Sequence, residues 1–181
     1  NPIITMYLWN SQDGEPLSIL NGNLEGHDTD GNIGPEYTIT RGNNIYARED
    51  DEGDNSQSGT DYSPDGGNSL NFIYDFDISG APPSYQDLSI TNLFYTGNMM
   101  HDIWYNYGFD EQSGNFQENN YGNGGQGGDS VIADAQDGSG LNNASFSPTT
   151  DGQNPIITMY LWNSQDGEPL SILNGDLEGT Y

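Results

Sequence analysis

Acidic and amide side chains at alternate positions are the residues of this sequence best suited to bind a metal ion. The first such group surrounds Gly31 and consists of Asp28, Asp30, Asn32 and Glu36. Calcium prefers oxygen ligands of this kind. An EF-hand loop has glycine at its sixth position and glutamate at its twelfth, and this segment meets neither condition. The pattern therefore predicts either a generic calcium-binding loop or a solvated turn.

A second acidic segment covers residues 49–54, in which Asp50, Asp51 and Asp54 are candidate calcium ligands. A run of like charges is also typical of a solvated surface. The whole sequence carries 28 acidic residues against two basic ones, Arg41 and Arg48, for a formal net charge of -26. Bound cations would offset the repulsion between so many carboxylates. We therefore predict calcium as the cofactor.

No catalytic group can be assembled from the sequence. A hydrolytic zinc site usually needs three ligands from His, Glu, Asp or Cys, but the only histidines are His27 and His101, and no HExxH motif occurs. No GxSxG motif is present either. His101 lies beside Asp102, where it is either a general base or, more commonly, a packed helix residue. We predict no catalytic residue and no zinc in this chain.

Composition excludes other classes of function. Almost no cationic side chain is available to meet phosphates, so we expect no binding to nucleic acid. The absence of cysteine excludes disulfides and thiolate metal sites. No apolar run approaches the length that spans a membrane. Aromatic residues make up 12% of the chain, which indicates a folded domain despite the high charge. The acidic, lysine-free composition and the predicted calcium favour a secreted, extracellular protein.

The two ends of the chain carry nearly the same sequence. Residues 1–26 read NPIITMYLWNSQDGEPLSILNGNLEG, and residues 154–179 repeat them with one change, from Asn23 to Asp176. In each copy an apolar run and a returning run flank an Asp-Gly pair, which predicts a β-hairpin. We therefore predict a hairpin segment at 1–26, a core at 27–153 and the second hairpin segment at 154–181.

Copies of one hairpin at both ends have a physical use. One copy can occupy, in a neighbouring subunit, the position that the other copy occupies in its own subunit. This exchange gives a head-to-tail contact. The apolar residues predicted to make this contact are Ile3, Met6, Leu8 and Trp9 in the first copy and Ile156, Met159, Leu161 and Trp162 in the second. The predicted partner is a further copy of the chain, in a fibre or array.

Between the copies, runs typical of strands cover residues 37–40, 44–47, 70–74, 130–135 and 142–146. One helix is predicted. Its start at residues 84–87 resembles a capping box with Asp in place of Glu, and Gly108 is a natural C-terminal stop. The apolar residues that recur at helical spacing are Leu93, Met100, Ile103, Trp104 and Tyr107. The expected class is α+β, mainly β with one long helix.

Several segments carry a more specific pattern. They are residues 36–44, 47–50, 63–67, 121–146 and 159–162, and above all residues 91–120, which read TNLFYTGNMMHDIWYNYGFDEQSGNFQENN. Together they resemble the fungalysin family of secreted zinc metallopeptidases, over roughly His27 to Trp162. The resemblance implies a thermolysin-like fold, in which this chain corresponds to the N-terminal lobe and its helix lies above the active-site cleft.

The resemblance also implies roles for single residues. Asn142, Asn143 and Ala144 look like the edge strand that hydrogen-bonds extended peptide substrates in such enzymes. Catalysis in the family comes from an HExxH helix and a downstream glutamate, which match no position here. His101 matches a family histidine that is not a zinc ligand. Independently of the resemblance, Asn143-Ala144-Ser145 is a sequon for N-glycosylation at Asn143.

Two functions follow. The first is a non-catalytic, secreted, calcium-bound module that assembles head-to-tail through its terminal hairpins. The alternative is a fragment of a secreted fungalysin-type zinc endopeptidase whose zinc-binding lobe is absent from this chain. The sequence narrowly favours the first, because the duplicated hairpins belong to the chain itself, whereas protease activity requires residues that it does not contain.

Overall fold

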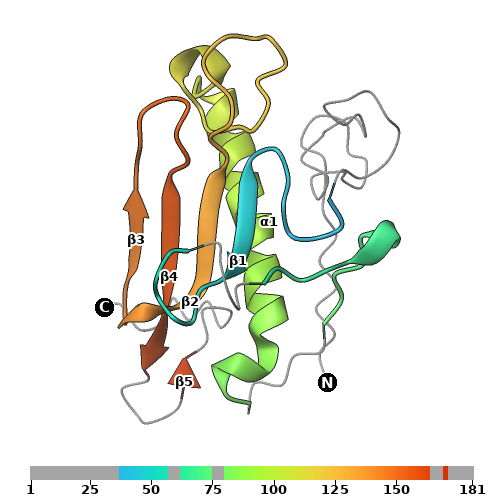
Figure 1. Cartoon of the computed structure of the whole chain (residues 1–181), viewed down its shortest axis with the longest axis vertical. Coiled ribbons are helices and arrows are strands. Elements are labelled where there is room, and N and C mark those ends of the chain that lie inside the picture. Colours follow the sequence, from blue (N-terminus) through green and yellow to red (C-terminus); the bar gives the residue numbers. More distant parts are fainter. Residues whose placement is uncertain (1–36, 57–61, 75–79, 164–168, 171–181) are drawn as a thin grey trace.

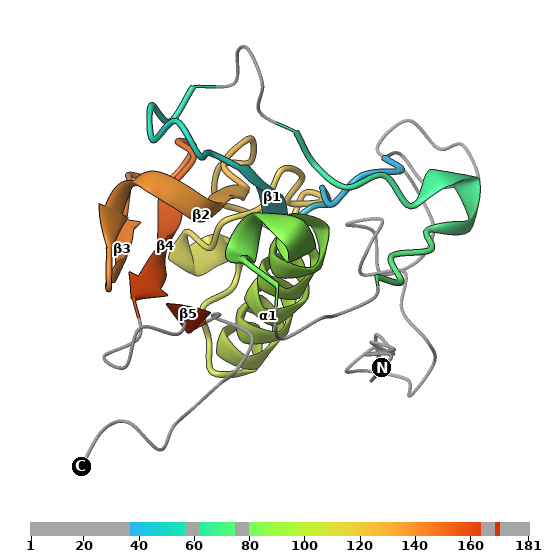
Figure 2. The same cartoon turned by 90° about the horizontal axis from the view of Figure 1, so that it is seen from below.

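The computed structural model describes residues 37–56, 62–74, 80–163 and 169–170 of the 181-residue chain. This part of the chain forms a mixed β-sheet with one long helix, α1 (Gln86–Asn106), packed on one of its faces (Figures 1 and 2). Short 3-10 helices lie at Gly67–Ser69, Pro82–Tyr85 and Glu111–Ser113. The predicted α+β class with one long helix is confirmed.

Four strands follow one another across the sheet in the order β1-β2-β4-β3. β1 (Ile45–Glu49), β2 (Val131–Leu141) and β4 (Ile156–Asn163) are parallel, and β3 (Ala144–Ser147) runs antiparallel to β4. The chain passes from β1 to β2 through α1, because parallel neighbours need a long crossover. A fifth strand, β5 (Pro169–Leu170), pairs antiparallel with the end of β4.

The second copy of the repeated segment supplies β4, which lies between β2 and β3. Its antiparallel pairing with β5 is the arrangement predicted for the hairpin of that copy. Residues 131–147 and 156–163 thus belong to one sheet, and the boundary predicted at residue 153 lies between two of its strands.

Two of the predicted strands are wrong. Residues 37–40 and 70–74 form no strand; the first segment only bridges Asp65 through Ile39. Leu70 has a φ of 50°, and the Asn71 N–H donates to the Gly66 carbonyl. These contacts close a local turn, so the chain here cannot stay extended. The strands predicted at 44–47, 130–135 and 142–146 are confirmed; the ends of the first and third shift by one or two residues, and β2 continues beyond residue 135 to Leu141.

The core lies between α1 and the first two strands. Its buried members are Ile45, Ala47, Phe72, Ile90, Phe94, Val131, Ala133 and Ala135. Successive side chains of a strand point to opposite faces, so the odd-numbered residues of β1 and of the first part of β2 face the helix. Arg48 and Asp134 therefore lie on the other face of the sheet.

Both ends of α1 have clear local causes. At its start the predicted capping box is wrong: Tyr85 is the N-cap and makes no side-chain cap, and the Ser84 hydroxyl donates to the Ala81 carbonyl. The preceding 3-10 turn begins with two prolines, which are preorganised for such a turn. At its end Gly108 has a φ of 96°, and the N–H groups of Gly108 and Phe109 donate to the carbonyls of Tyr105 and Trp104. This is a Schellman motif, so the predicted stop at Gly108 is confirmed.

The two halves of α1 differ in burial. Leu88, Ile90 and Phe94 in the first half are buried, whereas Ile103 and Trp104 in the second are about half exposed, at 45% and 52%. The predicted helix is confirmed, but most of the apolar residues predicted at helical spacing lie on its exposed part, and the sheet of the described residues covers only the first half. No helix in the described part of the chain is long and apolar enough to span a membrane.

Candidate functional site

The exposed edge of the sheet is formed by β3. This strand is last in the strand order, so its outer side has no strand partner among the described residues. All four residues of β3 are exposed, and so are Asn142 and Asn143 before it. An edge of this kind offers unpaired backbone groups to an extended peptide. Of the predicted residues, Ala144 is thus the first residue of an accessible edge strand, and Asn142 and Asn143 directly precede it.

The ladder between β3 and β4 indicates which backbone groups are available. Ala144 lies opposite Met159 and Phe146 opposite Ile157. The Tyr160 N–H donates to the Asn143 carbonyl over 3.2 Å. Backbone groups of an antiparallel strand alternate between facing the partner and facing away from it. We therefore expect those of Ala144 and Phe146 to face the free edge, where the Ala144 N–H is bonded to the Asn143 side chain and the Phe146 N–H is the donor left for a peptide.

Side chains near this edge are aromatic and amide groups. The ring of Phe146 meets that of Phe116 edge-on, with centroids 6.1 Å apart, and Phe116 meets Phe109 in the same way at 5.5 Å. The Asn143 Oδ1 accepts from the Ala144 N–H at 2.9 Å. The edge can therefore offer an apolar surface beside hydrogen-bonding groups. A glycan on Asn143 would occupy the same edge, so glycosylation and peptide binding exclude each other at this residue, and both stay predictions.

Three buried aspartates converge where the loop after β1 meets β2. One carboxylate oxygen each from Asp50, Asp134 and Asp137 lie within 4.8 Å of one another. All three residues are 0–1% exposed. Of these, the sequence indicated only Asp50. For the other two the sequence contains one indirect signal: Arg48 directly follows the strand predicted at 44–47, and an arginine that is buried needs an acidic partner.

A β-bulge in β2 brings Asp137 to this cluster. Asp134 and Asp137 are three residues apart, so a regular strand would direct them to opposite faces. The pairing with β4 is regular up to Ala135 and resumes at Asp137, which leaves Gln136 as the extra residue, with a φ of 55°. The Gln136 amide donates to the Ser89 hydroxyl of α1, so this side chain also lies on the helix face. Asp137 consequently returns to the face of Asp134.

Arg48 provides the positive charge beside the cluster. It lies directly opposite Asp134 in the β1–β2 ladder, and its Nε donates to Asp134 Oδ1 over 2.7 Å. Its Nη1 donates to the Ser56 carbonyl over 2.7 Å. Burial raises the pKa of Asp134, and the hydrogen bond from Arg48 opposes that shift. The arginine thus binds one of the three aspartates and the loop that follows β1.

The neighbouring acidic residues are arranged differently. Asp51 and Glu52 are exposed and form a second group with Glu49. Burial, followed by the hydrogen bond with Asp51, raises the pKa of Glu49 to about 7. The Asp54 carboxylate is exposed and accepts from the Ser56 N–H. The structure therefore separates Asp50 from the other two predicted ligands, Asp51 and Asp54.

Other predicted site residues lie outside the described residues. They are Asp28, Asp30, Asn32 and Glu36 of the first calcium group and Ile3, Met6, Leu8 and Trp9 of the first hairpin. The corresponding residues of the second copy lie in β4, where Ile156 pairs with Ile132 and Met159 with Ala135. Trp162 is 44% exposed. Their role in assembly stays a prediction.

His101 is not part of a metal cluster within the described regions. Its Nδ1 lies 3.3 Å from Asp102 Oδ1, and its Nε2 lies 3.5 Å from Asn115 Nδ2. A catalytic zinc ion needs three protein ligands, often with histidine among them. The metal-compatible groups in this part of the chain contain only carboxylates. These residues do not fit a zinc site.

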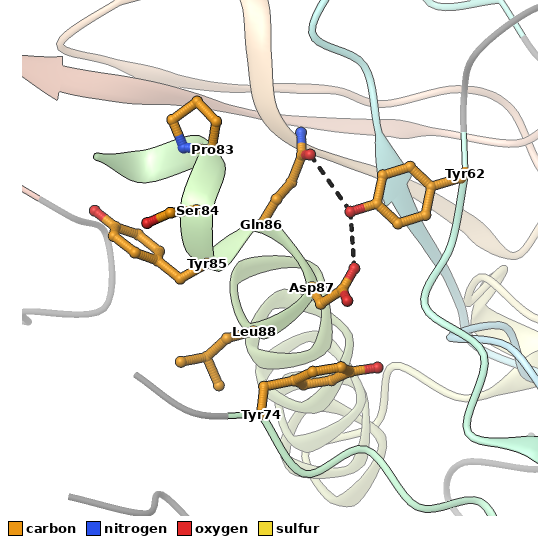
Figure 3. Close-up of a pocket in the computed structure, with 8 residues that line it drawn as sticks. All are labelled: Tyr62, Tyr74, Pro83, Ser84, Tyr85, Gln86, Asp87 and Leu88. Atoms are coloured by element: carbon orange, nitrogen blue, oxygen red, sulfur yellow. Dashed lines mark hydrogen bonds between the residues drawn. The ribbon is translucent and has the colours of Figure 1, made fainter. Parts of the chain in front are cut away.

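A pocket of about 190 Å³ lies at the start of α1 (Figure 3). The Tyr62 hydroxyl bonds Asp87 Oδ1 over 2.8 Å and also contacts Gln86 Oε1 at 3.4 Å. Burial, followed by the charge of Asp87, raises the pKa of Tyr74 to about 12. The hydrogen bond between the Tyr62 hydroxyl and the Asp87 carboxylate ties the segment at Tyr62 to the helix. Because these two groups already bond each other, they offer little to a ligand in the pocket.

Comparison with known proteins identifies relatives. The family model described as fungalysin metallopeptidase (M36) matches residues 10–177. The chain is 47% identical over 137 residues to the probable extracellular metalloproteinase 2 of Arthroderma benhamiae, an alignment that covers 74% of this chain and 21% of that protein. It is 46% identical over 143 residues to extracellular metalloproteinase 2 of Arthroderma otae, which covers 79% of this chain and 22% of that protein. It is 49% identical over 127 residues to extracellular metalloproteinase 5 of Arthroderma otae, which covers 70% of this chain and 20% of that protein. The chain thus spans about a fifth of the length of these curated relatives.

Proposed function

Because this chain belongs to the fungalysin metallopeptidase family, we propose that it forms the N-terminal, peptide-binding lobe of a secreted metallopeptidase. The names of the relatives, extracellular metalloproteinases, support both secretion and proteolysis for the whole protein. Since the described residues do not fit a zinc site, the catalytic metal ligands are expected elsewhere in that protein. The family match favours this function over a purely structural module.

The exposed β3 edge carries the proposal. An extended substrate can add to it as a further strand, because backbone hydrogen bonds recognise a peptide without regard to its side chains. The aromatic rings of Phe116 and Phe146 lie beside that edge and would contact substrate side chains. The lobe's part in the reaction is then to bind and orient the peptide, which is a large component of enzymatic rate enhancement.

Two substitutions of Phe146 test this role in the complete metallopeptidase. Phe146→Ala removes the ring and keeps the N–H, whereas Phe146→Pro removes both. We expect kcat/KM for peptide hydrolysis to be roughly twofold to tenfold lower for the proline than for the alanine variant, since one hydrogen bond contributes about 0.5–1.5 kcal/mol. Thermal stability should be similar, because this N–H faces away from β4. Equal kcat/KM for the two variants would contradict peptide binding at this edge.

Calcium is the second part of the proposal. The support is the excess of carboxylates, 28 acidic residues against two basic ones, together with the acidic groups of the chain. A bound divalent cation would lower their mutual repulsion and stabilise the folded lobe. Removal of calcium with EDTA is therefore expected to lower the melting temperature.

The duplicated end segments favour a second candidate function. Since the two copies differ at one position, the slot that β4 fills between β2 and β3 should accept the first copy of a neighbouring chain equally well. This exchange would give head-to-tail assembly.

Deleting residues 1–26 tests that assembly. We expect the deletion to reduce the particle to a single chain in light scattering, while circular dichroism shows that the core remains folded, because β4 stays in place. Particle size that does not change on deletion would rule out strand exchange and leave the peptide-binding function unaffected.

A further inference from the structure

We propose that Asp50, Asp134 and Asp137 together bind one divalent cation of the calcium type, at the point where the loop after β1 meets the bulge of β2. This inference deepens the calcium part of the proposed function by assigning a site, and it does not depend on peptide binding. Two of the three ligands were not indicated by the sequence.

The spacing of the oxygens suits such an ion. Calcium binds carboxylate oxygens at about 2.3–2.6 Å, so two ligands of one ion lie at most about 5 Å apart. The three aspartates each offer an oxygen within 4.8 Å of the others. Carboxylates are hard ligands, and calcium tolerates irregular coordination better than magnesium does. The spacing therefore fits a calcium ion, whose coordination need not be regular.

Unbonded oxygens provide an independent indication of a ligand. Asp134 Oδ2 and Asp137 Oδ2 are buried and have no hydrogen-bond partner within the described ranges. Their Oδ1 atoms are held, in Asp134 by Arg48 and in Asp137 by the N–H of Ser139. Buried polar atoms are nearly always paired in native proteins. A cation between these oxygens would supply the missing partner.

The balance of charge points the same way. Three aspartate carboxylates and Arg48 add to a formal charge of -2, that is, three negative charges and one positive. Arg41, the other basic residue of the sequence, instead lies over the rings of Tyr37 and Tyr46. Buried charges without partners are strongly unfavourable. One divalent ion makes this cluster neutral.

The surrounding backbone holds the aspartates in place. Both oxygens of Asp50 accept backbone N–H groups, from Asp54 at 3.1 Å and from Asn55 at 2.9 Å. The Gly138 N–H donates to the Asp50 carbonyl over 2.9 Å. A Cβ on Gly138 would lie 1.8 Å from the Asp51 carbonyl oxygen, so only glycine permits the loop to approach the bulge this closely. Ligands fixed in this way lose little entropy when the ion binds.

Calorimetric titration of the complete, EDTA-treated chain with calcium chloride tests the site. We expect saturable binding and a rise in melting temperature on addition of calcium. Asp137→Asn should weaken calcium binding by roughly tenfold or more and remove most of the calcium-dependent rise. The matched control is Asp51→Asn, the same change at an exposed neighbour, which should keep both.

A proton on Asp134 is the main rival to a cation, and Asp134→Asn distinguishes the two because asparagine mimics the protonated acid. If a proton neutralises the cluster, neither calcium nor EDTA changes the melting temperature of the wild type, and Asp134→Asn is at least as stable as the wild type. This result overturns the site and the calcium part of the proposed function. If EDTA destabilises the wild type and both cluster variants equally, calcium binds elsewhere, and only the site is wrong. Loss of the calcium response in both variants, but not in Asp51→Asn, supports it.

Discussion

Arg48→Met should lower the free energy of unfolding by about 3–5 kcal/mol, the range found when one partner of a buried ion pair is removed. Methionine keeps the apolar stem of the arginine, so the loss comes mainly from the charge. Arg48 is 1% exposed and its guanidinium bonds both Asp134 and the Ser56 carbonyl. Without it, Asp134 remains buried beside two other aspartates. Urea denaturation in the presence of EDTA, which excludes compensation by calcium, measures the effect.

The other arginine of the sequence provides the control. Arg41 is partly exposed and lies over the rings of Tyr37 and Tyr46, with 4.5 and 4.9 Å to the ring centroids. Cation–π contacts contribute about 0.5–2 kcal/mol, so Arg41→Met should cost much less. Adding Asp134→Leu to Arg48→Met should recover part of the loss, because it removes the unpaired charge. Equal losses for the two single variants would show that Arg48 is not an essential buried partner.

Phe94→Ala should lower the free energy of unfolding by about 3–5 kcal/mol. The Phe94 side chain is fully buried between α1 and the first two strands, in contact with the main apolar cluster. Its removal leaves a cavity that the packed strands cannot close, because the β1–β2 ladder fixes their spacing. The measurement is chemical denaturation followed by circular dichroism.

Trp104→Ala on the same helix is the matched control. Trp104 is 52% exposed and meets the ring of Tyr107 edge-on, at 6.4 Å between centroids. We expect a loss of about 1 kcal/mol or less, as for most exposed positions. A loss as large as that of Phe94→Ala would mean that the exposed second half of α1 is covered by a part of the protein outside the described residues.

The predicted helix and three of the five predicted strands agree with the structure because they depend on local sequence. Gly108 ends α1 through its own positive φ, and β2 begins with the strand-forming residues Val131 and Ile132. The errors also have local causes that a pattern does not reveal. Residues 70–74 resemble a strand in composition, but the turn at Leu70 prevents pairing. Ser84 matches a capping pattern, but a 3-10 turn moves the helix start past it.

The candidate peptide-binding edge was predictable in part. The resemblance to fungalysins implied an edge strand at Asn142, Asn143 and Ala144, and the strand order places β3, which begins at Ala144, at the edge. Peptide binding at this edge stays a prediction. Burial along α1 was not predictable, since most of the apolar residues at helical spacing lie in its exposed second half. Only the position of the sheet decides that Phe94 is buried and that Trp104 is exposed.

By itself the sequence determined the family, the acidic character, the repeated end segments, the long helix and three of the five strands predicted between the repeats, because each of these depends on consecutive residues. The tertiary structure alone decided that Asp50 meets Asp134 and Asp137. These residues are 84 and 87 positions from Asp50, and one lies on the expected face only because Gln136 forms a bulge. Strand pairing and one extra residue set such convergence, and neither has a signature in local sequence.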